Sequence, residues 1–440
     1  MKKVLIVAYY FPPLGGGGTL RTVKFVKYLQ EFGWEPVVLT VNAPHYLVED
    51  PWLESQVPPN LMVFRSKAFL PGRFFRKTLN HSYTDTVDRR KPVFKRMGKS
   101  VFQFGKNLVY TFAFTPDEYV GWIPFAVKAG LRIIEREKID ALYTTAPPNS
   151  LHLIGRKLHR KTGLPWVADF RDLWNQYPES YNPFGWKWKA HLDDWLEKQV
   201  LETCQKAIAV SETMKQELLA KYRKLPEKKL AVITNGFDPA DSEGLSPDPI
   251  AQGKFLVTHA GTLFAWRKAS GFWRVLRKML DQNAEFARYF RLLLLGIVHA
   301  DVQAEIRRLG LTPWVDIQGY KNYPEMVRIL KRSDVLLLII GNQPHAANVL
   351  TLKLFDYLNA RRPILALAPE GEVSRMVRNY HLGKSCLPED LPGVEKALRH
   401  FFSAWQDNQL SWPAQGDLSP FHRSQLTAQL AAMLDEVVTC

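Results

Sequence analysis

Asp356 is the residue whose type and position first suggest chemistry. It lies inside a predicted helix, where Leu350, Leu354 and Leu358 form an apolar stripe and where aspartate is a poor helix former. Its two carboxylate oxygens could accept hydrogen bonds from two neighbouring hydroxyl groups, such as those of a ribose. The alternative is a solvated surface charge, with Lys353 one turn away as a weak ion-pair partner. The residues alone leave both interpretations open.

A second polar group follows an apolar run at residues 165–168. This run is typical of a strand, and Asp169, Arg171 and Asp172 come directly after it. Open α/β sheets bind ligands at the carboxyl ends of their strands, so these side chains could act as acid, base or sugar ligands. An arginine between two carboxylates can also form a self-satisfied surface cluster. Asp169 and Asp172 remain equal candidates for a catalytic carboxylate.

A glycine run, residues 15–18, lies between a predicted strand and a predicted helix. Glycine lets the backbone approach a phosphate or a sugar closely, and helix N-termini favour anions. The run does not match the dinucleotide fingerprint, because its third position is Leu20. The alternative is a flexible turn without a ligand.

The segment from Lys353 to Val373 resembles the retaining glycosyltransferases of family GT4, which have the GT-B fold. The likeness rests on the pattern Lys353-Leu-Phe-Asp-Tyr-Leu-Asn-Ala-Arg-Arg-Pro-Ile-Leu, followed by Pro-Glu-Gly-Glu-Val. It implies that Asp356 binds the ribose of a nucleotide sugar. Lys353, Glu370 and Glu372 would belong to the same donor site. The family usually has a second Glu eight residues before this Asp, and the chain has Asn348 there.

The resemblance also covers segments elsewhere in the chain. It implies that Gly16 and Gly17 help to hold the donor phosphates or the acceptor, and that Gly261 borders the donor site. Arg267 and Lys268 follow this glycine, and they would meet the donor diphosphate and take up the charge of the departing nucleotide. Cations are otherwise unfavourable at the start of a helix.

The stretch 169–172 looks like the family's loop that contacts the transferred sugar and the acceptor. Many members have a His in this loop, and this chain has none there. No cofactor is implied, because the nucleotide diphosphate sugar is a co-substrate. No Asp-x-Asp pair suggests a metal that bridges the diphosphate, so cationic side chains would serve instead.

The elements that must position these residues alternate between strand and helix. This alternation predicts an α/β protein with parallel, doubly wound sheets, and the resemblance implies two Rossmann-like domains that face each other across a cleft. We expect an acceptor-side domain at 1–245 and a nucleotide-sugar-binding domain at 250–420. A terminal helix at 421–440 would pack back on the first domain.

Residues 60–125 interrupt this rhythm with phenylalanines interleaved with Arg and Lys. Such a mixture suits an anionic membrane surface or a lipid-linked acceptor, and we assign Arg73, Arg76, Lys77 and Trp122 to that contact. It could also bind single-stranded nucleic acid by stacking. The structural alternative is an insertion in which Arg and Lys stems cover their own core.

The composition favours anionic partners. Lys and Arg number 59 against 43 Asp and Glu, which gives a net charge of +16. No apolar run approaches the ~18 residues that a membrane-spanning helix needs. The apolar start is followed by prolines and glycines without a cleavage site for a signal peptide. We therefore expect a cytoplasmic protein, with peripheral attachment to the inner face of the membrane as an option.

The resemblance thus implies a metal-independent, hexosyltransferase-type enzyme of cell-envelope polysaccharide biosynthesis. It would move a sugar, with retention, from a nucleotide diphosphate sugar to a hydroxyl of a glycan or lipid-linked acceptor. One alternative is a Rossmann-type nucleotide-cofactor oxidoreductase, for which Tyr380 and Lys384 match a reductase spacing in an unsuitable context. Another is a non-enzymatic basic protein that binds membranes or, less favoured, nucleic acid.

Overall fold

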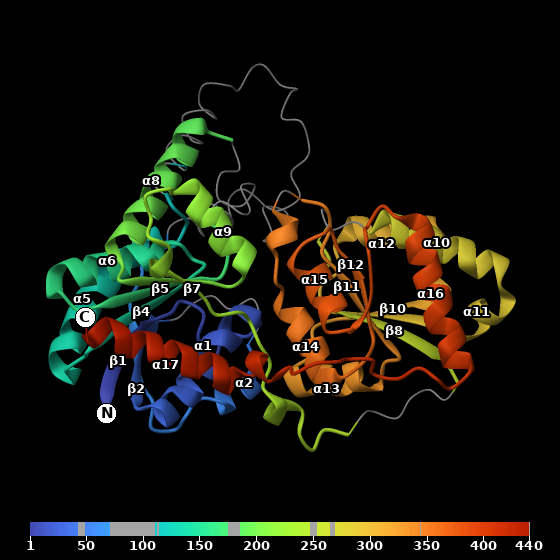
Figure 1. Cartoon of the computed structure of the whole chain (residues 1–440), viewed down its shortest axis with the longest axis horizontal. Coiled ribbons are helices and arrows are strands. Elements are labelled where there is room, and N and C mark those ends of the chain that lie inside the picture. Colours follow the sequence, from blue (N-terminus) through green and yellow to red (C-terminus); the bar gives the residue numbers. More distant parts are fainter. Residues whose placement is uncertain are drawn as a thin grey trace. The chain divides into compact units, whose positions relative to one another are not determined.

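A computed structural model describes residues 1–42, 49–70, 111, 114–174, 185–246, 253–264, 269–343 and 345–439. These residues form two compact units, each with its own parallel sheet (Figure 1). The N-terminal unit comprises Met1–Thr234 with Arg423–Cys440, and the C-terminal unit comprises Asn235–His422. The predicted α/β class with doubly wound parallel sheets is confirmed.

The sheet of the N-terminal unit has seven strands in the order β3-β2-β1-β4-β5-β6-β7. Its strands are β1 (Lys2–Val7), β2 (Trp34–Val41), β3 (Met62–Ser66), β4 (Ala141–Ala146), β5 (Trp166–Phe170), β6 (Lys206–Ala209) and β7 (Leu230–Val232). Its α-helices are α1 (Gly17–Tyr28), α2 (Pro51–Ser55), α5 (Ile123–Glu137), α6 (Ser150–Thr162), α8 (Lys187–Thr203), α9 (Glu212–Lys221) and α17 (Arg423–Thr439).

Helices cover both faces of this sheet, because successive side chains of a strand point to opposite faces. On β1, Val4 and Ile6 pack with α1 and α17, whereas Leu5 and Val7 pack with α5 and α6. All four side chains are fully buried. A run of consecutive apolar residues is therefore what this strand requires.

The C-terminal sheet has six strands in the order β10-β9-β8-β11-β12-β13. Its strands are β8 (Phe255–Ala260), β9 (Phe290–Leu295), β10 (Val315–Gln318), β11 (Val335–Ile339), β12 (Ile364–Leu367) and β13 (Gly383–Cys386). Its α-helices are α10 (Ser270–Gln282), α11 (Ala284–Tyr289), α12 (Ala300–Arg308), α13 (Tyr323–Arg332), α14 (Leu352–Ala360), α15 (Glu372–Asn379) and α16 (Leu391–Gln406).

The leucine run of β9 shows the same two-faced burial. Leu292 and Leu294 pack in the core with α10 and α16, and Leu293 and Leu295 pack in the core with α13 and α14. The short strands are thus the middle layer between two helical layers. Their carboxyl ends, where the chain turns into the next helix, are the places that can present functional side chains.

Helix α14 carries the predicted apolar stripe and ends in a left-handed turn. Leu354 and Leu358 are buried on α14, and Leu350 is buried just before it. The helix ends at Ala360 because Arg361 adopts a left-handed conformation with a φ of 55°. The turn thus begins before the Arg362-Pro363 pair, in which proline could not continue a helix.

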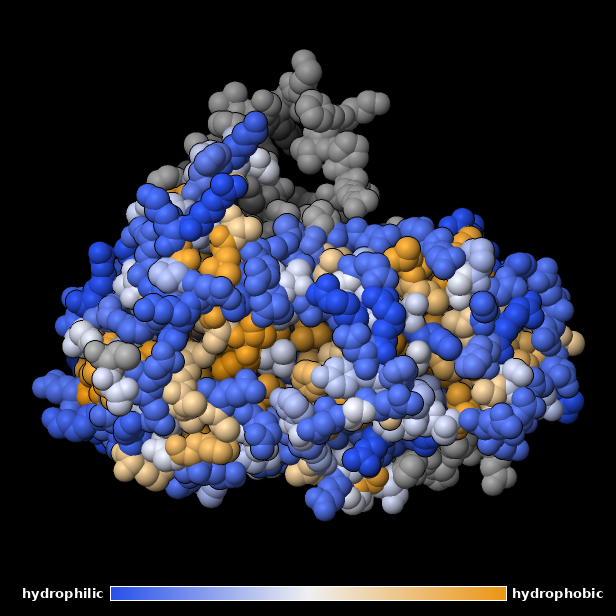
Figure 2. Space-filling view, in the orientation of Figure 1, coloured by the Kyte–Doolittle hydropathy of each residue, from blue (hydrophilic) through white to orange (hydrophobic). Residues whose placement is uncertain are grey.

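The terminal helix α17 belongs to the N-terminal unit. Leu426, Leu430 and Leu434, at four-residue spacing, lie in the same buried cluster as Val23 and Phe25 of α1. None of the helices in the described ranges is long and apolar enough to cross a membrane. Hydrophilic residues make up most of the face shown in Figure 2, as the excess of Lys and Arg leads one to expect.

Candidate functional site

Each sheet has a point where the strand order changes direction. In the N-terminal unit this point lies between β1 and β4, and in the C-terminal unit it lies between β8 and β11. Open α/β sheets bind ligands outside the carboxyl ends of the strands at such points. The glycine run follows β1, and Gly261 follows β8, so both predicted segments begin at one of these edges.

In the N-terminal unit the glycine run leads directly into α1. Gly16 precedes the helix with a φ of 98°, a left-handed value that glycine adopts easily. The carbonyl of Gly18 accepts a hydrogen bond from Nη1 of Arg171 at 2.6 Å. A methyl group at Gly18 would approach Arg171 Nη1 to 3.3 Å and the Tyr10 ring to 3.4 Å. Gly18 is therefore closely packed, whereas Gly16 has open space where a methyl group would lie.

Arg171 connects two loops at the switch point of this sheet. Besides Gly18, its guanidinium donates to the carbonyl oxygens of Pro147 at 2.6 Å and Ala146 at 3.2 Å. The loop after β1 and the loop after β4 are thereby held by one side chain. Arg171 therefore holds the backbone of both loops in place, and it stabilises the shape of the loops that surround any ligand.

Asp169 lies inside the N-terminal unit rather than at its surface. Its side chain is 0% exposed, and Oδ1 and Oδ2 accept from Nη2 and Nε of Arg21 at 2.9 Å and 3.0 Å. The hydroxyls of Tyr143 and Thr145 also donate to Oδ2, at 2.6 Å and 2.9 Å. Burial raises the pKa of Asp169, but the Arg21 charge and these hydrogen bonds bring it below its ordinary value. Asp169 is therefore a buried, ionised anchor.

Arg21 is the functional-site residue that the sequence analysis missed. It also donates to the carbonyl oxygens of Ile233 and Thr234, at 2.9 Å and 2.6 Å, so it joins α1, β5 and the end of β7. A signal was present, because Arg21 lies one turn before Phe25 on the apolar face of the predicted helix. A cation on a buried face requires an anionic partner.

The remaining predicted residues of this unit divide into three groups. Asp172 is half-buried and lies just past the carboxyl end of β5. Trp122 is 0% exposed, and its indole N–H donates to Ser66 Oγ at 2.8 Å, so the expected contact with a membrane or an acceptor is corrected to a core role. Arg73, Arg76 and Lys77 lie outside the described residues.

In the C-terminal unit Lys353 lies over the end of β8. Its Nζ is 3.4 Å from Nε2 of His259 and 3.4 Å from the carbonyl oxygen of Thr262. Gly261 has a φ of 110°, and a methyl group there would overlap the Lys353 side chain. Glycine at this position therefore permits a lysine from α14 to bring its ammonium group to the switch point.

Asp356 lies one turn after Lys353 on α14 and is half-buried. The hydroxyl of Tyr323, at the start of α13, lies 3.4 Å from its Oδ1. The next residue, Tyr357, is buried, and its hydroxyl accepts from the backbone N–H of Ala260 at 2.9 Å. The helix is thus bonded directly to β8, which places the carboxylate and the ammonium group beside the same edge of the sheet.

Glu370 and Glu372 stand on either side of Gly371, in the turn after β12. Glu370 is exposed and forms two hydrogen bonds with Arg378, at 2.8 Å and 2.6 Å, which lower its pKa. Glu372 pairs with Arg375 at 3.0 Å. A methyl group at Gly371 would overlap the backbone of Ala347, so this turn packs directly on the loop that precedes α14.

One segment of the chain matches a family of known proteins. Residues 91–241 match the model of Glycosyltransferase Family 4. The match covers about a third of the chain, so this segment is similar to glycosyltransferase family 4. The match and the two parallel sheets together indicate a glycosyltransferase that moves a sugar from a nucleotide-sugar donor. No curated protein matches the chain.

Solved structures share the fold of the transferase over almost its whole length. Sucrose-phosphate synthase from Thermosynechococcus elongatus is 12% identical with a TM-score of 0.62, covering 100% of this chain and 97% of that one. HepE of Anabaena, in complex with UDP-glucose, is 13% identical with a TM-score of 0.59 over 100% and 97%. WaaG, a glycosyltransferase involved in lipopolysaccharide biosynthesis, is 13% identical with a TM-score of 0.58 over 99% and 98%. The predicted GT-B fold is confirmed.

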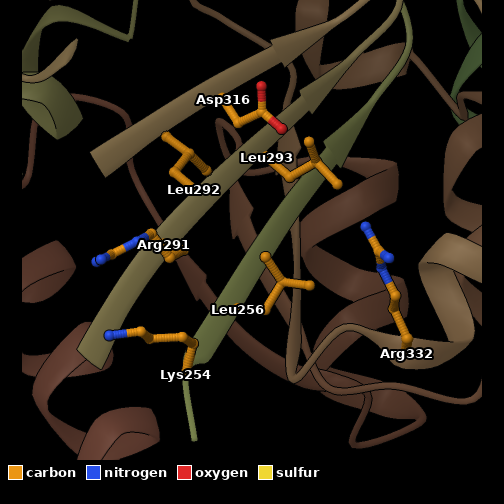
Figure 3. Close-up of a pocket in the computed structure, with 7 residues that line it drawn as sticks. All are labelled: Lys254, Leu256, Arg291, Leu292, Leu293, Asp316 and Arg332. Atoms are coloured by element: carbon orange, nitrogen blue, oxygen red, sulfur yellow. The ribbon is translucent and has the colours of Figure 1, made fainter. Parts of the chain in front are cut away.

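A pocket of the transferase lies at the other end of the C-terminal sheet, away from Gly261. Its volume is about 310 Å³, and Figure 3 shows its lining residues: Lys254, Leu256, Arg291, Leu292, Leu293, Asp316 and Arg332. These residues come from the amino-terminal ends of β8, β9 and β10 and from the end of α13. The pocket is therefore separate from the edge that carries Lys353.

Arg267 and Lys268, the predicted diphosphate ligands, lie outside the described ranges, so their role stays a prediction. Within those ranges no group of three or more His, Cys, Asp and Glu side chains is placed to hold a metal ion. The residues that the structure brings together at the donor edge are Gly261, Lys353 and Asp356. Those that it brings together at the other edge are Gly18, Asp169 and Arg171.

Proposed function

We propose that this transferase moves a hexosyl group from a nucleoside diphosphate sugar to a hydroxyl of a glycan or lipid-linked acceptor. The glycosidic configuration would be retained. The donor would bind at the carboxyl edge of the C-terminal sheet. Asp356 would accept from the ribose hydroxyls, and Lys353 would face the diphosphate together with Arg267 and Lys268, without a metal.

The observation that carries this proposal is the placement of Lys353 over Gly261, with Asp356 one turn further along α14. The cation and the carboxylate differ in what they can bind, since an ammonium group only donates hydrogen bonds and a carboxylate only accepts them. A nucleoside diphosphate offers both complements, namely anionic phosphate oxygens and a ribose diol. The switch point of the sheet is where such a ligand binds in open α/β folds.

On the acceptor side, the glycine run and Asp172 border the carboxyl edge of the N-terminal sheet. We assign Asp172, the half-buried carboxylate, to contact with the acceptor or the transferred sugar. Asp169 and Arg171 would act by positioning these loops. An envelope glycan is the acceptor class that we favour, since WaaG, which shares the fold, is involved in lipopolysaccharide biosynthesis. The excess of positive charge supports work at an anionic membrane surface on its cytoplasmic face.

Ligand-dependent thermal unfolding tests the donor site. The wild type and Asp356→Ala are heated with UDP, GDP, dTDP and NAD, and Asp407→Ala serves as a control at an exposed aspartate of the same unit. A ligand at ~100 times its dissociation constant stabilises a protein by about 2.7 kcal/mol. We expect one nucleoside diphosphate to raise the Tm of the wild type and of the control, and to raise that of Asp356→Ala much less.

The nucleoside diphosphate that stabilises the wild type then identifies the nucleotide of the donor sugar for a transfer assay. Release of the nucleoside diphosphate from its sugar is followed with and without membrane glycolipid extracts as acceptor, and the anomeric configuration of the product is read by NMR. An inverted product would contradict the proposed retention. Equal stabilisation of the wild type and Asp356→Ala by the same nucleotide would contradict the role of Asp356.

A further inference from the structure

His259 is a fully buried histidine on β8 that lies beneath the Lys353 ammonium group. Its Nδ1 is 2.9 Å from the carbonyl oxygen of Leu337 on β11. The hydroxyl of Tyr357 donates to the same carbonyl at 3.0 Å and accepts from Ala260 N–H. One carbonyl oxygen therefore ties both the imidazole and helix α14 to the centre of the sheet.

The hydrogen-bond partners determine which ring nitrogen carries the proton. A carbonyl oxygen can only accept, so Nδ1 of His259 must be the donor. In the neutral ring Nε2 is then an acceptor, and it faces Nζ of Lys353, which can only donate, at 3.4 Å. The geometry thus matches an imidazole that is neutral and protonated on Nδ1.

We propose that neutral His259 is a positioning residue that seats the Lys353 ammonium over Gly261, and that protonation of His259 weakens diphosphate binding. The inference rests on the donor role proposed for Lys353. It adds a regulation of that site, because the position of the Lys353 ammonium group over Gly261 would depend on whether His259 is charged. His259 itself need not touch the donor.

Protonation would change both the hydrogen bond and the charge. Nε2 would carry a hydrogen and could no longer accept from Lys353, and two cations would lie 3.4 Å apart. Lys353 would leave its seat, since it is the more flexible side chain and its stem is half-buried rather than enclosed. Because burial and the Lys353 charge both disfavour a charged imidazole, protonation of His259 requires acid conditions.

The surroundings of the imidazole give the other groups that bear on its charge. Helix α14 contributes Lys353, the hydroxyl of Tyr357 and, between them, Asp356, which acts electrostatically on Tyr357. On β9 the register partner of His259 is the apolar Leu294, and β11 presents the Leu337 carbonyl. A negative Asp356 favours a charged imidazole, whereas Lys353 and burial disfavour it.

The first test reads the tautomer directly and needs no ligand. In the transferase labelled with ¹⁵N-histidine, the ring nitrogens of His259 are assigned by their loss in His259→Gln. We expect the shift pattern of a ring protonated on Nδ1 at pH 8 and of a doubly protonated ring in acid. A ring protonated on Nε2 at pH 8 would overturn the proposal.

The second test measures diphosphate affinity by calorimetry at pH 8.0 and pH 5.5, with inorganic pyrophosphate, UDP, GDP and dTDP as probes. Each phosphate ligand has its own titration, which is the same for every protein variant. The ratio of the Kd of wild type to that of His259→Gln at each pH therefore isolates the contribution of His259. His400→Gln, at an exposed position of α16, is the matched control.

We expect the wild type and His400→Gln to lose about tenfold more affinity on acidification than His259→Gln, whose carboxamide stays uncharged. Parallel pH profiles for all three proteins would overturn the proposal. Failure of every probe to bind the wild type at both pH values would overturn the donor site, and the regulation with it. The tautomer is measured independently of any ligand. A ring protonated on Nδ1 would then show that His259 is arranged to accept from Lys353 although no diphosphate binds there.

Discussion

Nη2 of Arg21 lies 2.9 Å from Oδ1 of Asp169, and the two side chains are 1% and 0% exposed. Nε of the same guanidinium lies 3.0 Å from Oδ2, so the pair is bidentate. The arginine belongs to the helix that follows the glycine run, and the aspartate ends the strand at the candidate acceptor edge. The pair therefore fixes the position of the glycine run relative to the loop that carries Asp172.

Replacing Asp169 by Asn is expected to destabilise the N-terminal unit. The substitution removes the charge that balances the buried Arg21 guanidinium, and breaking a buried ion pair in this way costs about 3–5 kcal/mol. In a unit of this size the loss corresponds to a fall in Tm of roughly 10 °C. Thermal unfolding followed by circular dichroism measures it.

Asp172→Asn is the matched control, because it makes the same change three residues away at a half-buried position. Its Tm should stay close to that of the wild type, while its kcat for sugar transfer should fall. If instead Asp169→Asn keeps the wild-type Tm and loses kcat, then Asp169 is a catalytic group and not the anchor described above.

Gly261→Ala is expected to weaken nucleotide binding by displacing Lys353. The added methyl group would overlap the lysine side chain, and the positive φ adds strain of about 1–2 kcal/mol. We expect the Kd of the nucleoside diphosphate that binds the wild type to rise about tenfold, as measured by calorimetry.

Gly253→Ala separates the two effects, since Gly253 also has a positive φ, 81°, but has open space where a methyl group would lie. It should lose stability without losing nucleotide affinity. In a background of Lys353→Ala, Gly261→Ala should cause no further loss of affinity. A full additional loss there would show that crowding of Lys353 is not the cause.

The buried His152 should make the free energy of unfolding depend on pH. It is fully buried, and burial lowers its pKa from 6.5 to about 3. The unfolded chain therefore binds a proton at this residue below about pH 6.5 that the folded protein does not, so the stability that neutral His152 contributes is lost as the pH falls from 6.5 towards 3. At pH 5.0 the loss is about 2 kcal/mol.

His152→Gln, which cannot be protonated, is expected to lack this loss. Urea unfolding at pH 7.5 and pH 5.0 gives the change in free energy of unfolding for the wild type and the variant, and the wild type should lose about 2 kcal/mol more. The buried Asp193 carboxyl, whose pKa burial raises to about 6, titrates in the same range but equally in both proteins. Identical changes in the two proteins would mean that His152 is already charged in the folded state.

Local patterns were enough to predict the architecture of each unit. The predicted strands before the glycine run and at residues 165–168 are the buried strands β1 and β5, and the leucine stripe of α14 is buried as well. Side-chain periodicity predicts this burial because it reflects which faces a strand or a helix covers. The resemblance to family GT4 could also be read from the sequence, since its pattern is a continuous stretch around Asp356. These signals lie within a few residues of one another.

What only the tertiary structure decided is the choice of partners between distant segments. Arg21 and Asp169 are 148 positions apart, and although a buried arginine requires an anionic partner, its segment does not indicate which residue that is. Trp122 stands among basic and aromatic residues in the sequence, yet a hydroxyl 56 positions away and the surrounding core make it a buried residue. Hydrogen-bond partners and burial depend on which elements the fold brings together. The sequence by itself therefore determined the elements, and the packing of those elements determined the roles of the charged side chains.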